Sequence, residues 1–355
     1  MEKILTIVIP TYNMENFLPK ALTSLVVEEE LMNILEVIVV NDGSKDSSLD
    51  IAYAFQKQYP QTFHVINKEN GNYGSCVNRG LLEAKGKYIK ILDADDSFDN
   101  AVFSQYLEKI KTLDVDVIFN DAKLVKPDGT EVAQWIVPVP KYRIYNFFSF
   151  PFFPEMHTIA FRTKNLRQIG YWQTEGISYT DQEWVFSPIS TVHNAYYCPG
   201  ILYLYLVGRE GQTMTPAIKR KQLNQTLTVL KNMLKVYDHG IYTEESKLWM
   251  KSKLMDNMSV IYKRTIIDLR DDKNKELIEC DKYIKENHFD FYKESDKCLF
   301  LSRKIRYNYG RIWRKNYKVN YRNPIFLLYY FLCKFKSNKT CLLYTSDAAD
   351  DLIGV

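Results

Sequence analysis

The sequence predicts an α/β protein built on a mostly parallel sheet, and three observations lead to this fold class. Continuous apolar runs such as LTIVIP (Leu5–Pro10) and LEVIVV (Leu35–Val40) are typical of strands that are buried on both faces. Stretches with helical spacing of apolar residues separate these runs, as in βαβ units. Polar clusters follow the strands at their carboxyl ends, where parallel sheets bind ligands.

The expected elements alternate along the first half of the chain. A helical stripe over residues 14–30 separates the first two strands. Asp46 or Ser47 is placed to cap the helix that follows the second strand. The remaining elements expected here are a strand Phe63–Asn67, a helix through Val77 and Leu81, a strand within GKYIKILDADD, a helix from about Asn100 to Thr112 and a strand Asp114–Phe119.

The later half of the chain changes character twice. The stretch from about Pro138 to Arg209 is irregular and rich in aromatic residues and proline, and we interpret it as completing the first domain. From about Ala217 the pattern indicates helices. We therefore expect a first domain over residues 1–215 and a helical region over residues 216–341. Residues 342–355, LLYTSDAADDLIGV, break the preceding basic and aromatic composition and resemble translated sequencing-adapter read-through, so we interpret them as a non-native tail.

Composition narrows the class of protein. The formal net charge of +4 on 355 residues is too small to make the whole molecule a binder of polyanions. None of the six cysteines forms a C-x-x-C spacing. The N-terminal MEKILTIVIP lacks the pattern of a signal peptide, and the longest apolar run, IFLLYYFLCKF, is shorter than the roughly 20 residues that cross a bilayer. These features predict a reduced, cytoplasmic protein.

Four motifs, VIPTYN, VVNDGSKDSS, GKYIKILDADD and YTDQEW, occur in this order. Together they resemble family 2 glycosyltransferases of the GT-A fold, over roughly residues 4–210. The resemblance implies that residues 1–215 are a nucleotide-sugar-binding catalytic domain with a helical C-terminal extension. It also implies an inverting, metal-dependent transfer of a sugar from a nucleotide-sugar donor, expected to be a UDP-sugar, to a saccharide hydroxyl. The similar enzymes that build bacterial capsule, exopolysaccharide or cell-wall glycans point to a lipid-linked acceptor.

The DADD cluster (Asp93, Ala94, Asp95 and Asp96) is the expected donor-phosphate site. A divalent cation that bridges two phosphates stabilises a departing nucleoside diphosphate, and Mg²⁺ or Mn²⁺ prefers carboxylate oxygens. Asp95 matches the metal-binding carboxylate of the family's D-x-D motif, Asp93 matches the position that faces the ribose, and Ala94 lies between them. The alternative is a solvated acidic turn before the helix that starts near Asp99.

Residues after the first two strands are expected to hold the nucleoside. Asp42 matches the family's residue that accepts a hydrogen bond from a pyrimidine N–H, although a turn residue is the alternative. Pro10, Thr11 and Tyr12 match the loop that walls the base pocket, and Glu15 lies just beyond them.

A further donor contact is expected in the helix after the Gly/Asn-rich loop KENGNYGS. Asn78 matches the Asn of an Arg-Asn pair that many relatives carry in this helix. Val77 stands where the Arg would be, which weakens the inference about which donor is used.

Asp181 in YTDQEW is the expected catalytic base, because an acceptor hydroxyl becomes a good nucleophile only as a base removes its proton. Glu183 is the alternative base. Capping of a helix by Thr180 or Asp181 is the structural alternative.

Three further side chains are weaker candidates. Arg209 is positioned in the sequence to clamp the diphosphate, with a solvated loop as the alternative. His157 and His193 either line the site or are structural.

The C-terminal stretch Arg303–Lys339 contains no acidic residue. Its basic and aromatic residues suggest attachment to an anionic membrane surface, so we expect a peripheral protein on the inner face of the plasma membrane. Nucleic-acid binding and a solvated helical face are the alternatives, but no recognised nucleic-acid module accompanies the stretch. The basic residues are Arg303, Lys304, Arg306, Arg311, Arg314, Lys315, Lys318, Arg322, Lys334, Lys336 and Lys339.

Two other functions compete with sugar transfer. A nucleotidyltransferase would carry a Gly-rich phosphate loop with Arg or Lys after its first strand, and PTYNMEN is not one. A non-catalytic nucleotide-sugar-binding protein would not need both Asp95 and Asp181.

Overall fold

The computed structural model describes residues 2–208, 216–301 and 307–329, with the side chains of all of these except residues 216–221. The chain divides into two compact units, Met1–Gln212 and Thr213–Val355.

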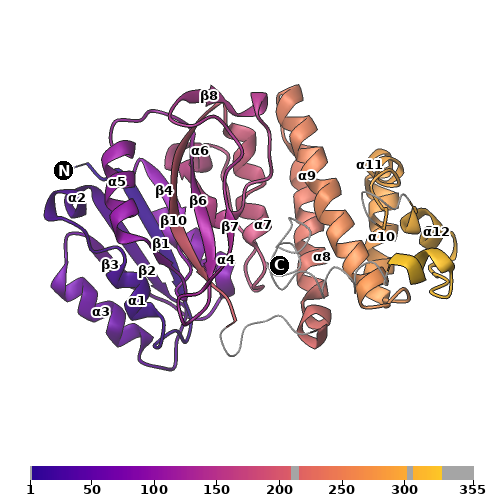
Figure 1. The fold of residues 1–355 in the computed structure, drawn as a ribbon, viewed down its shortest axis with the longest axis horizontal. Helices are drawn as coiled ribbons and strands as arrows, with labels where there is room; N and C mark the ends of the chain where they lie inside the picture. Colours follow the sequence, from indigo (N-terminus) through magenta and orange to yellow (C-terminus); the bar gives the residue numbers. More distant parts are fainter. Residues whose placement is uncertain (1, 209–215, 302–306, 330–355) are drawn as a thin grey trace. The chain divides into compact units, whose positions relative to one another are not determined.

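The first unit contains a ten-stranded sheet in the order β3-β2-β1-β4-β9-β6-β10-β5, with β7 paired to β6 and β8 paired to β10 (Figure 1). Its strands are β1 (Leu5–Thr11), β2 (Leu35–Asn41), β3 (Phe63–Asn67), β4 (Tyr88–Ile91), β5 (Ser97–Phe98), β6 (Val117–Val125), β7 (Glu131–Trp135), β8 (Ile144–Asn146), β9 (Ile159–Arg162) and β10 (Asn194–Leu206).

The expected mostly parallel sheet is confirmed. β1 pairs in parallel with β2 along its whole length, up to Thr11 opposite Asn41, and in parallel with β4, up to Val8 opposite Ile91. β9 is antiparallel to both β4 and β6, which makes those two strands parallel to each other. The carboxyl ends of β1, β2 and β4 therefore meet at one edge of the sheet.

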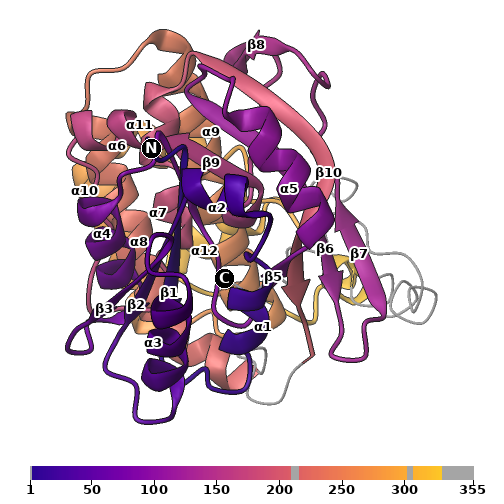
Figure 2. The same cartoon turned by 90° about the vertical axis from the view of Figure 1, so that its left-hand side faces the viewer.

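Helices cover both faces of this sheet (Figure 2). Leu5, Ile7 and Ile9 of β1 lie in the same core cluster as Phe103 and Leu107 of α5. On the other face, a Cβ at Gly80 of α4 would lie 2.4 Å from Cγ1 of Val8, so α4 approaches β1 closely. The helices of this unit are α1 (Leu18–Thr23), α2 (Glu29–Ile34), α3 (Ser48–Gln58), α4 (Asn72–Glu83), α5 (Asn100–Ile110), α6 (Thr163–Gln168) and α7 (Asp181–Trp184).

The helix expected over residues 14–30 is instead two short helices, α1 and α2. Ser24 ends α1, where its hydroxyl donates a 2.6 Å hydrogen bond to the carbonyl of Ala21. The segment after it, Leu25–Val27, ends in two β-branched residues, which have a low helix propensity.

The expected strand Asp114–Phe119 is longer than predicted and continues to Val125. Its polar residues Asn120 and Asp121 are buried because tertiary partners satisfy them. Asn120 Oδ1 accepts a 2.8 Å hydrogen bond from Lys90, and the Asp121 carboxylate accepts one of 2.7 Å from the hydroxyl of Tyr197.

The stretch expected to be irregular, from about residue 138 to 209, contains the 13-residue strand β10. The pairing of β10 with β6 is interrupted between Tyr197 and Ile201, around Pro199 and Gly200. Because this Pro-Gly interruption breaks the alternation of side chains, the sequence pattern concealed the strand.

The second unit is helical in its described part, as expected. Its elements are α8 (Pro216–His239), α9 (Glu244–Tyr262), a π-helical turn Lys263–Asp268, α10 (Lys275–Asn287), α11 (Phe289–Ser295) and α12 (Tyr309–Asn316). In the described part of the chain, we find no helix with both the length and the apolar character that a membrane crossing requires.

Candidate active site

The loops after β1 and β2 are joined by hydrogen bonds at the carboxyl edge of the sheet. The amide of Glu15 donates to the carboxylate of Asp46 at 2.9 Å, and the Glu15 carboxylate accepts from the amide of Ser47 at 3.0 Å. Asp46 also accepts from the amide of Ser48, the first residue of α3, at 3.0 Å, whereas Ser47 occupies the N-cap position without a side-chain capping hydrogen bond. Glu15 therefore ties the two loops together, and this is the role that the structure gives it.

The loop PTYN is only partly open to solvent. Thr11 is buried, and its hydroxyl donates to the carbonyl of Ile9 at 3.2 Å, so it does not present a hydroxyl as expected. Pro10 is half-buried. The ring of Tyr12 is 47% exposed and is the part of this loop that a ligand can reach.

Asp42 is buried at the end of β2, and its carboxylate binds the loop that follows β3. It forms an ion pair with Lys68 and accepts a 2.9 Å hydrogen bond from the amide of Gly71. Lys68 also donates to Ser75 at the start of α4 at 2.8 Å. Lys68 was not among the predicted site residues, although its place after β3, the strand beside the one that Asp42 follows, was a usable signal.

The DADD turn follows β4 at the same edge. Asp93 and Asp95 are half-buried, whereas Ala94 and Asp96 are buried. Asp96 accepts hydrogen bonds of 2.7 Å from the hydroxyl of Tyr203 and from the amide of Leu206, which attaches the turn to β10. Ala94 is therefore packed inside the turn, whereas Asp93 and Asp95 keep partial exposure to solvent.

Negative charge accumulates in this turn. Burial raises the pKa of Asp96 well above its usual range, and the charges of Asp95 and Asp93 raise it further. A divalent cation beside Asp95 would offset that charge.

Tyr73 of α4 connects its helix to the DADD turn. Its hydroxyl donates a 2.7 Å hydrogen bond to Oδ1 of Asp93 and lies 3.1 Å from the sulfur of Met156. Burial raises the pKa of Tyr73 well above its usual value, with further contributions from Asp93 and then Asp181. Tyr73 was not among the predicted site residues.

Asp181 lies within electrostatic reach of the DADD turn. Burial raises the pKa of Tyr205, and the charges of Asp96, Asp93, Asp95 and Asp181 raise it further, in that order. Carboxylates from two segments that are distant in the sequence therefore act on one phenol. The predicted metal carboxylate and the predicted base belong to the same region of the first unit.

Asp181 and Glu183 have different environments in α7. Asp181 is half-buried, whereas Glu183 is buried. The Glu183 carboxylate accepts two hydrogen bonds from Thr174, one of 2.7 Å from the Thr174 amide and one of 2.6 Å from the Thr174 hydroxyl. No side-chain hydrogen bond caps α7, so the capping role considered for Thr180 or Asp181 is not observed. Trp184 is fully buried and anchors the helix.

Asn78 is buried and bonded to a neighbouring segment of the chain. It is fully buried, its amide nitrogen donates to the carbonyl of Gln173 at 2.8 Å and to Glu175 at 2.9 Å, and its oxygen accepts from the amide of Gln173 at 2.8 Å. A Cβ at Gly74 would lie 2.1 Å from the carbonyl oxygen of Thr174. The expected donor contact by Asn78 is replaced by positioning of residues 173–175.

The two histidines lie in contrasting places. His157 is buried, with its ring centroid 4.3 Å from that of Trp135, and burial lowers the pKa of His157 to about 3, with a smaller effect from Lys90. His193 is exposed just before β10, at the sheet edge opposite the DADD turn. The predicted clamp Arg209 lies outside the described residues.

The residues present are compatible with a divalent cation. Within the described ranges, no three His, Cys, Asp or Glu side chains are arranged to hold a metal by themselves. Mg²⁺ and similar cations commonly bind through one or two carboxylates plus substrate phosphates and water. Asp95, the predicted metal carboxylate, would supply that protein share.

Comparisons with known proteins find glycosyltransferases among the similar sequences. Residues 6–169 match the family model described as Glycosyl transferase family 2. Over 97 residues the chain is 42% identical to an uncharacterized glycosyltransferase, the MG025 homolog of Mycoplasma pneumoniae. These 97 residues are 27% of this chain and 32% of that protein. Over 125 residues it is 30% identical to the minor teichoic acid biosynthesis protein GgaB of Bacillus subtilis, covering 33% of this chain and 14% of GgaB.

A solved structure supports the fold. The structure of S. aureus TarS 1-349 in complex with UDP-GlcNAc aligns with a TM-score of 0.57 at 18% identity, covering 84% of this chain and 82% of that one. At this identity the likeness establishes the GT-A fold alone. The aligned segment spans about a third or less of the two curated relatives.

Proposed function

Because residues 6–169 form a domain of glycosyl transferase family 2, we propose that the protein transfers a sugar from a UDP-sugar to a hydroxyl of a saccharide acceptor, with inversion at the anomeric carbon. The proposal is supported by the position of the DADD turn after β4, at the carboxyl edge of the parallel sheet, together with the electrostatic proximity of Asp93, Asp95 and Asp181 to one phenol, Tyr205. A donor-phosphate site and a base within reach of one another are what such a transfer needs.

In this reaction the acceptor oxygen attacks the anomeric carbon while the bond from that carbon to the phosphate oxygen breaks. Asp181 takes the proton of the acceptor hydroxyl, and the nucleoside diphosphate leaves with the electron pair of the broken bond. Inversion follows because the base and the leaving group lie on opposite faces of the sugar. Glu183 is a weaker candidate for the base because Thr174 already occupies both of its oxygens.

Donor binding is assigned to the carboxyl edge of the sheet. Tyr12 offers an exposed ring for the base, Asp42 is the proposed acceptor for a pyrimidine N–H, and Asp93 faces the ribose. Asp95 would hold Mn²⁺ or Mg²⁺, which when bound neutralises the charge that develops on the diphosphate. A uridine nucleotide is favoured because the solved TarS structure contains UDP-GlcNAc.

The acceptor is proposed to be a growing bacterial surface polysaccharide, and the support for this is the name of the similar protein GgaB, a minor teichoic acid biosynthesis protein. A lipid-linked acceptor would place the enzyme at the inner face of the plasma membrane. The C-terminal basic stretch is the segment that we assign to attachment.

Part of that stretch belongs to the core of the second unit. Trp313 is fully buried and donates through its indole N–H to the carbonyl of Asp272 at 2.7 Å. Arg314 is paired with Asp281 at 2.9 Å and with Asp296 at 2.6 Å. Residues 302–306 and 330–339 of the stretch lie outside the described residues. Attachment is therefore assigned to the exposed cations, namely Arg311, Lys315, Lys318 and Arg322.

Donor hydrolysis tests the transfer proposal. The full chain is incubated with UDP-sugars and Mn²⁺, and release of UDP is measured. We expect slow hydrolysis that is lost in Asp95→Ala and retained in Asp50→Ala, a variant that removes a carboxylate from α3. Release of pyrophosphate from a nucleoside triphosphate and a sugar phosphate, with no UDP release, would instead identify a nucleotidyltransferase.

Liposome binding tests the attachment proposal. Replacing Arg311, Lys315, Lys318 and Arg322 by Gln should weaken co-sedimentation with vesicles that contain phosphatidylglycerol, because each cation contributes about 1 kcal/mol at an anionic surface. Replacing four exposed lysines of the same unit is the matched control, namely Lys247, Lys273, Lys275 and Lys285. Equal losses in both variants would refute a specific role of the C-terminal stretch.

A further inference from the structure

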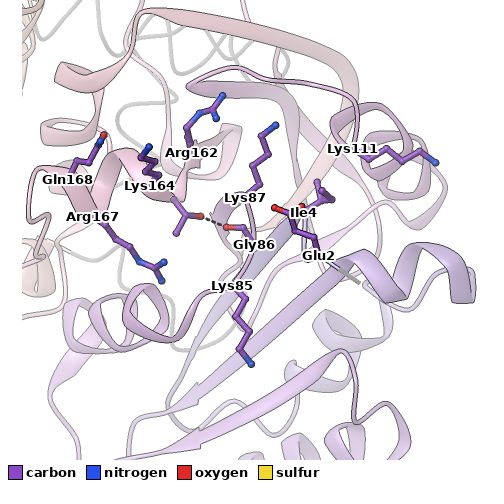
Figure 3. Close-up of a pocket in the computed structure, with 11 residues that line it drawn as sticks. Glu2, Ile4, Lys85, Gly86, Lys87, Lys111, Arg162, Lys164, Arg167 and Gln168 are labelled. Carbon is purple, nitrogen blue, oxygen red and sulfur yellow. Dashed lines mark hydrogen bonds between the residues drawn. The ribbon is translucent and has the colours of Figure 1, made fainter.

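A cavity of about 700 Å³ lies at the edge of the first unit's sheet opposite the DADD turn (Figure 3). Ile4 precedes β1 and Lys87 precedes β4, so the cavity borders the amino ends of these parallel strands. Its volume lies within the roughly 300–1,000 Å³ of small-molecule sites. The donor site proposed above lies at the carboxyl ends of the same strands, so the two sites are separate.

The lining of this cavity is strongly basic. One acidic side chain, Glu2, lines it, against six cationic ones from three separate stretches of the chain. The cations are Lys85, Lys87, Lys111, Arg162, Lys164 and Arg167.

A hydrogen bond from a side chain to the backbone lies among these cations. The hydroxyl of Thr163 donates a 2.6 Å hydrogen bond to the carbonyl of Gly86, which joins the start of α6 to the turn before β4 (Figure 3). Lys87 and Arg162 extend on one side of this bond, and Lys85 and Arg167 extend on the other. A ligand that spans the cavity therefore meets positive charge on both sides.

Several of these cations are held in place by neighbouring groups. Lys87 lies 3.0 Å and Arg162 lies 2.6 Å from the same carboxylate oxygen of Asp114. Lys85 lies 4.0 Å from the buried carboxylate of Glu36, and Lys111 pairs with Glu108. These acids reduce the positive charge but do not line the cavity.

Among the described residues, two of these cations, Arg167 and Lys164, have no acidic partner. Arg167 donates to the carbonyls of Leu81 at 2.9 Å and Ala84 at 2.6 Å, which orients its guanidinium without neutralising it. Lys164 is exposed, and among the described residues neither it nor Arg167 has a carboxylate within ion-pair distance.

We propose that this cavity binds an anion with two or more adjacent phosphate groups. A ligand of that kind carries several charges and many acceptor oxygens, which match Lys and Arg donors spread over both sides of the Gly86–Thr163 contact. A single carboxylate would satisfy only one side. The phosphates come either from a free oligophosphate or from the headgroups of a phospholipid surface, because both present the same chemistry.

Calorimetric titration of the full chain with tripolyphosphate tests the proposal. The titration is carried out with a chelator, so that no divalent cation supports phosphate binding at the DADD turn. Lys85→Gln with Lys164→Gln removes two exposed charges from the cavity. Lys20→Gln with Lys57→Gln removes two exposed charges from α1 and α3 and is the matched control. A second arm measures co-sedimentation with phosphatidylcholine vesicles, with and without phosphatidylglycerol.

We expect saturable binding that weakens by about tenfold or more in the cavity variant and stays within about twofold in the control, because charge-assisted contacts are lost only in the former. Binding of tripolyphosphate with this pattern identifies a free oligophosphate as the ligand. The same pattern with phosphatidylglycerol vesicles alone identifies lipid headgroups. Absence of both, or equal weakening in the two variants, overturns the proposal. Neither outcome depends on sugar transfer.

Discussion

The hydroxyl of Tyr73 donates a 2.7 Å hydrogen bond to Oδ1 of Asp93, and this contact joins α4 to the turn that carries the proposed metal carboxylate. The phenol is protonated and a donor at neutral pH, and burial raises the pKa of Tyr73 still further above its usual value. One oxygen of Asp93 is thus oriented by the protein and not by solvent. The arrangement leads to the first of five predictions.

Tyr73→Phe should weaken binding of a UDP-sugar by about tenfold, the scale of one hydrogen bond to a charged group. The ring stays in place, so the fold is expected to persist, but Asp93 loses its orienting partner. Calorimetric titration with donor and Mn²⁺ measures the effect. Tyr53→Phe, on the exposed side of α3, is the control and should bind normally. Equal affinities in all three proteins would show that Tyr73 does not position Asp93 for donor binding.

Asp181→Asn should leave donor affinity nearly unchanged and reduce transfer by about 10²–10⁴-fold, the usual effect of losing a general base. The substitution keeps the size of the side chain and removes its ability to accept a proton. Donor titration and transfer rates are measured on the same preparation. If the variant instead lost donor affinity with a normal rate at saturation, Asp181 would belong to the donor site.

Glu183→Ala should destabilise the first unit by about 2–4 kcal/mol, because it leaves the amide and the hydroxyl of the half-buried Thr174 without their partner. Urea unfolding followed by tryptophan fluorescence reports on this region through the adjacent Trp184. Glu175→Ala is a useful comparison, since it removes one contact to Asn78. A fully stable but inactive Glu183→Ala would make Glu183 the better candidate for the base.

His157 should make the first unit less stable as the pH falls. Burial lowers the pKa of His157 to about 3, from the usual 6.5, so the folded state keeps the ring neutral while the unfolded state takes up a proton. Stability from this group is therefore present above pH 6.5 and is lost towards pH 3, by at most about 1.4 kcal/mol per pH unit.

The variant His157→Phe removes this titration and keeps an aromatic ring beside Trp135. The difference in unfolding free energy between wild type and variant should shift against the wild type as the pH is lowered from neutrality. His193→Gln, at an exposed position, should follow the wild-type curve. Parallel curves for His157→Phe and wild type would rule out this assignment.

Arg314→Ala should destabilise the second unit by about 3–5 kcal/mol, because it leaves the fully buried Asp281 without its ion-pair partner. Arg311→Ala, three residues earlier on the exposed side of α12, should change stability by less than about 0.5 kcal/mol. Hydrogen exchange of the backbone amides in α10 measures the loss of stability in each of the two variants. Similar protection in the two variants would mean that the buried ion pair is not a stabilising element.

The strands β1 and β2 and the position of the motifs after the strands could be predicted from local sequence patterns. β1 and β2 were predictable because a strand buried on both faces needs an uninterrupted apolar run, and that requirement is visible in the sequence. The placement of NDGS and DADD at one edge followed from parallel pairing. β10 was not predictable, since Pro199 and Gly200 interrupt its pattern and pairing with β6 compensates for the interruption.

Residue roles at the site depended on partners distant in the sequence. Asp42 and Lys68 meet only because β2 and β3 are neighbours, and Asn78 is buried only because residues 173–175 cover it. The distinction between Asp181 and Glu183 depends on Thr174, which no local pattern indicates.

The sequence by itself determined the class of sheet, the family of motifs and the carboxylates available for chemistry, because these depend on residue type and local spacing. The tertiary structure alone decided which of those polar groups are bonded to partners inside the protein, as with Asn78 and Arg314, and which stay partly exposed, as with Asp95. The physical reason is that burial of a polar or charged group is tolerated only with a partner, and the partner is selected by the fold.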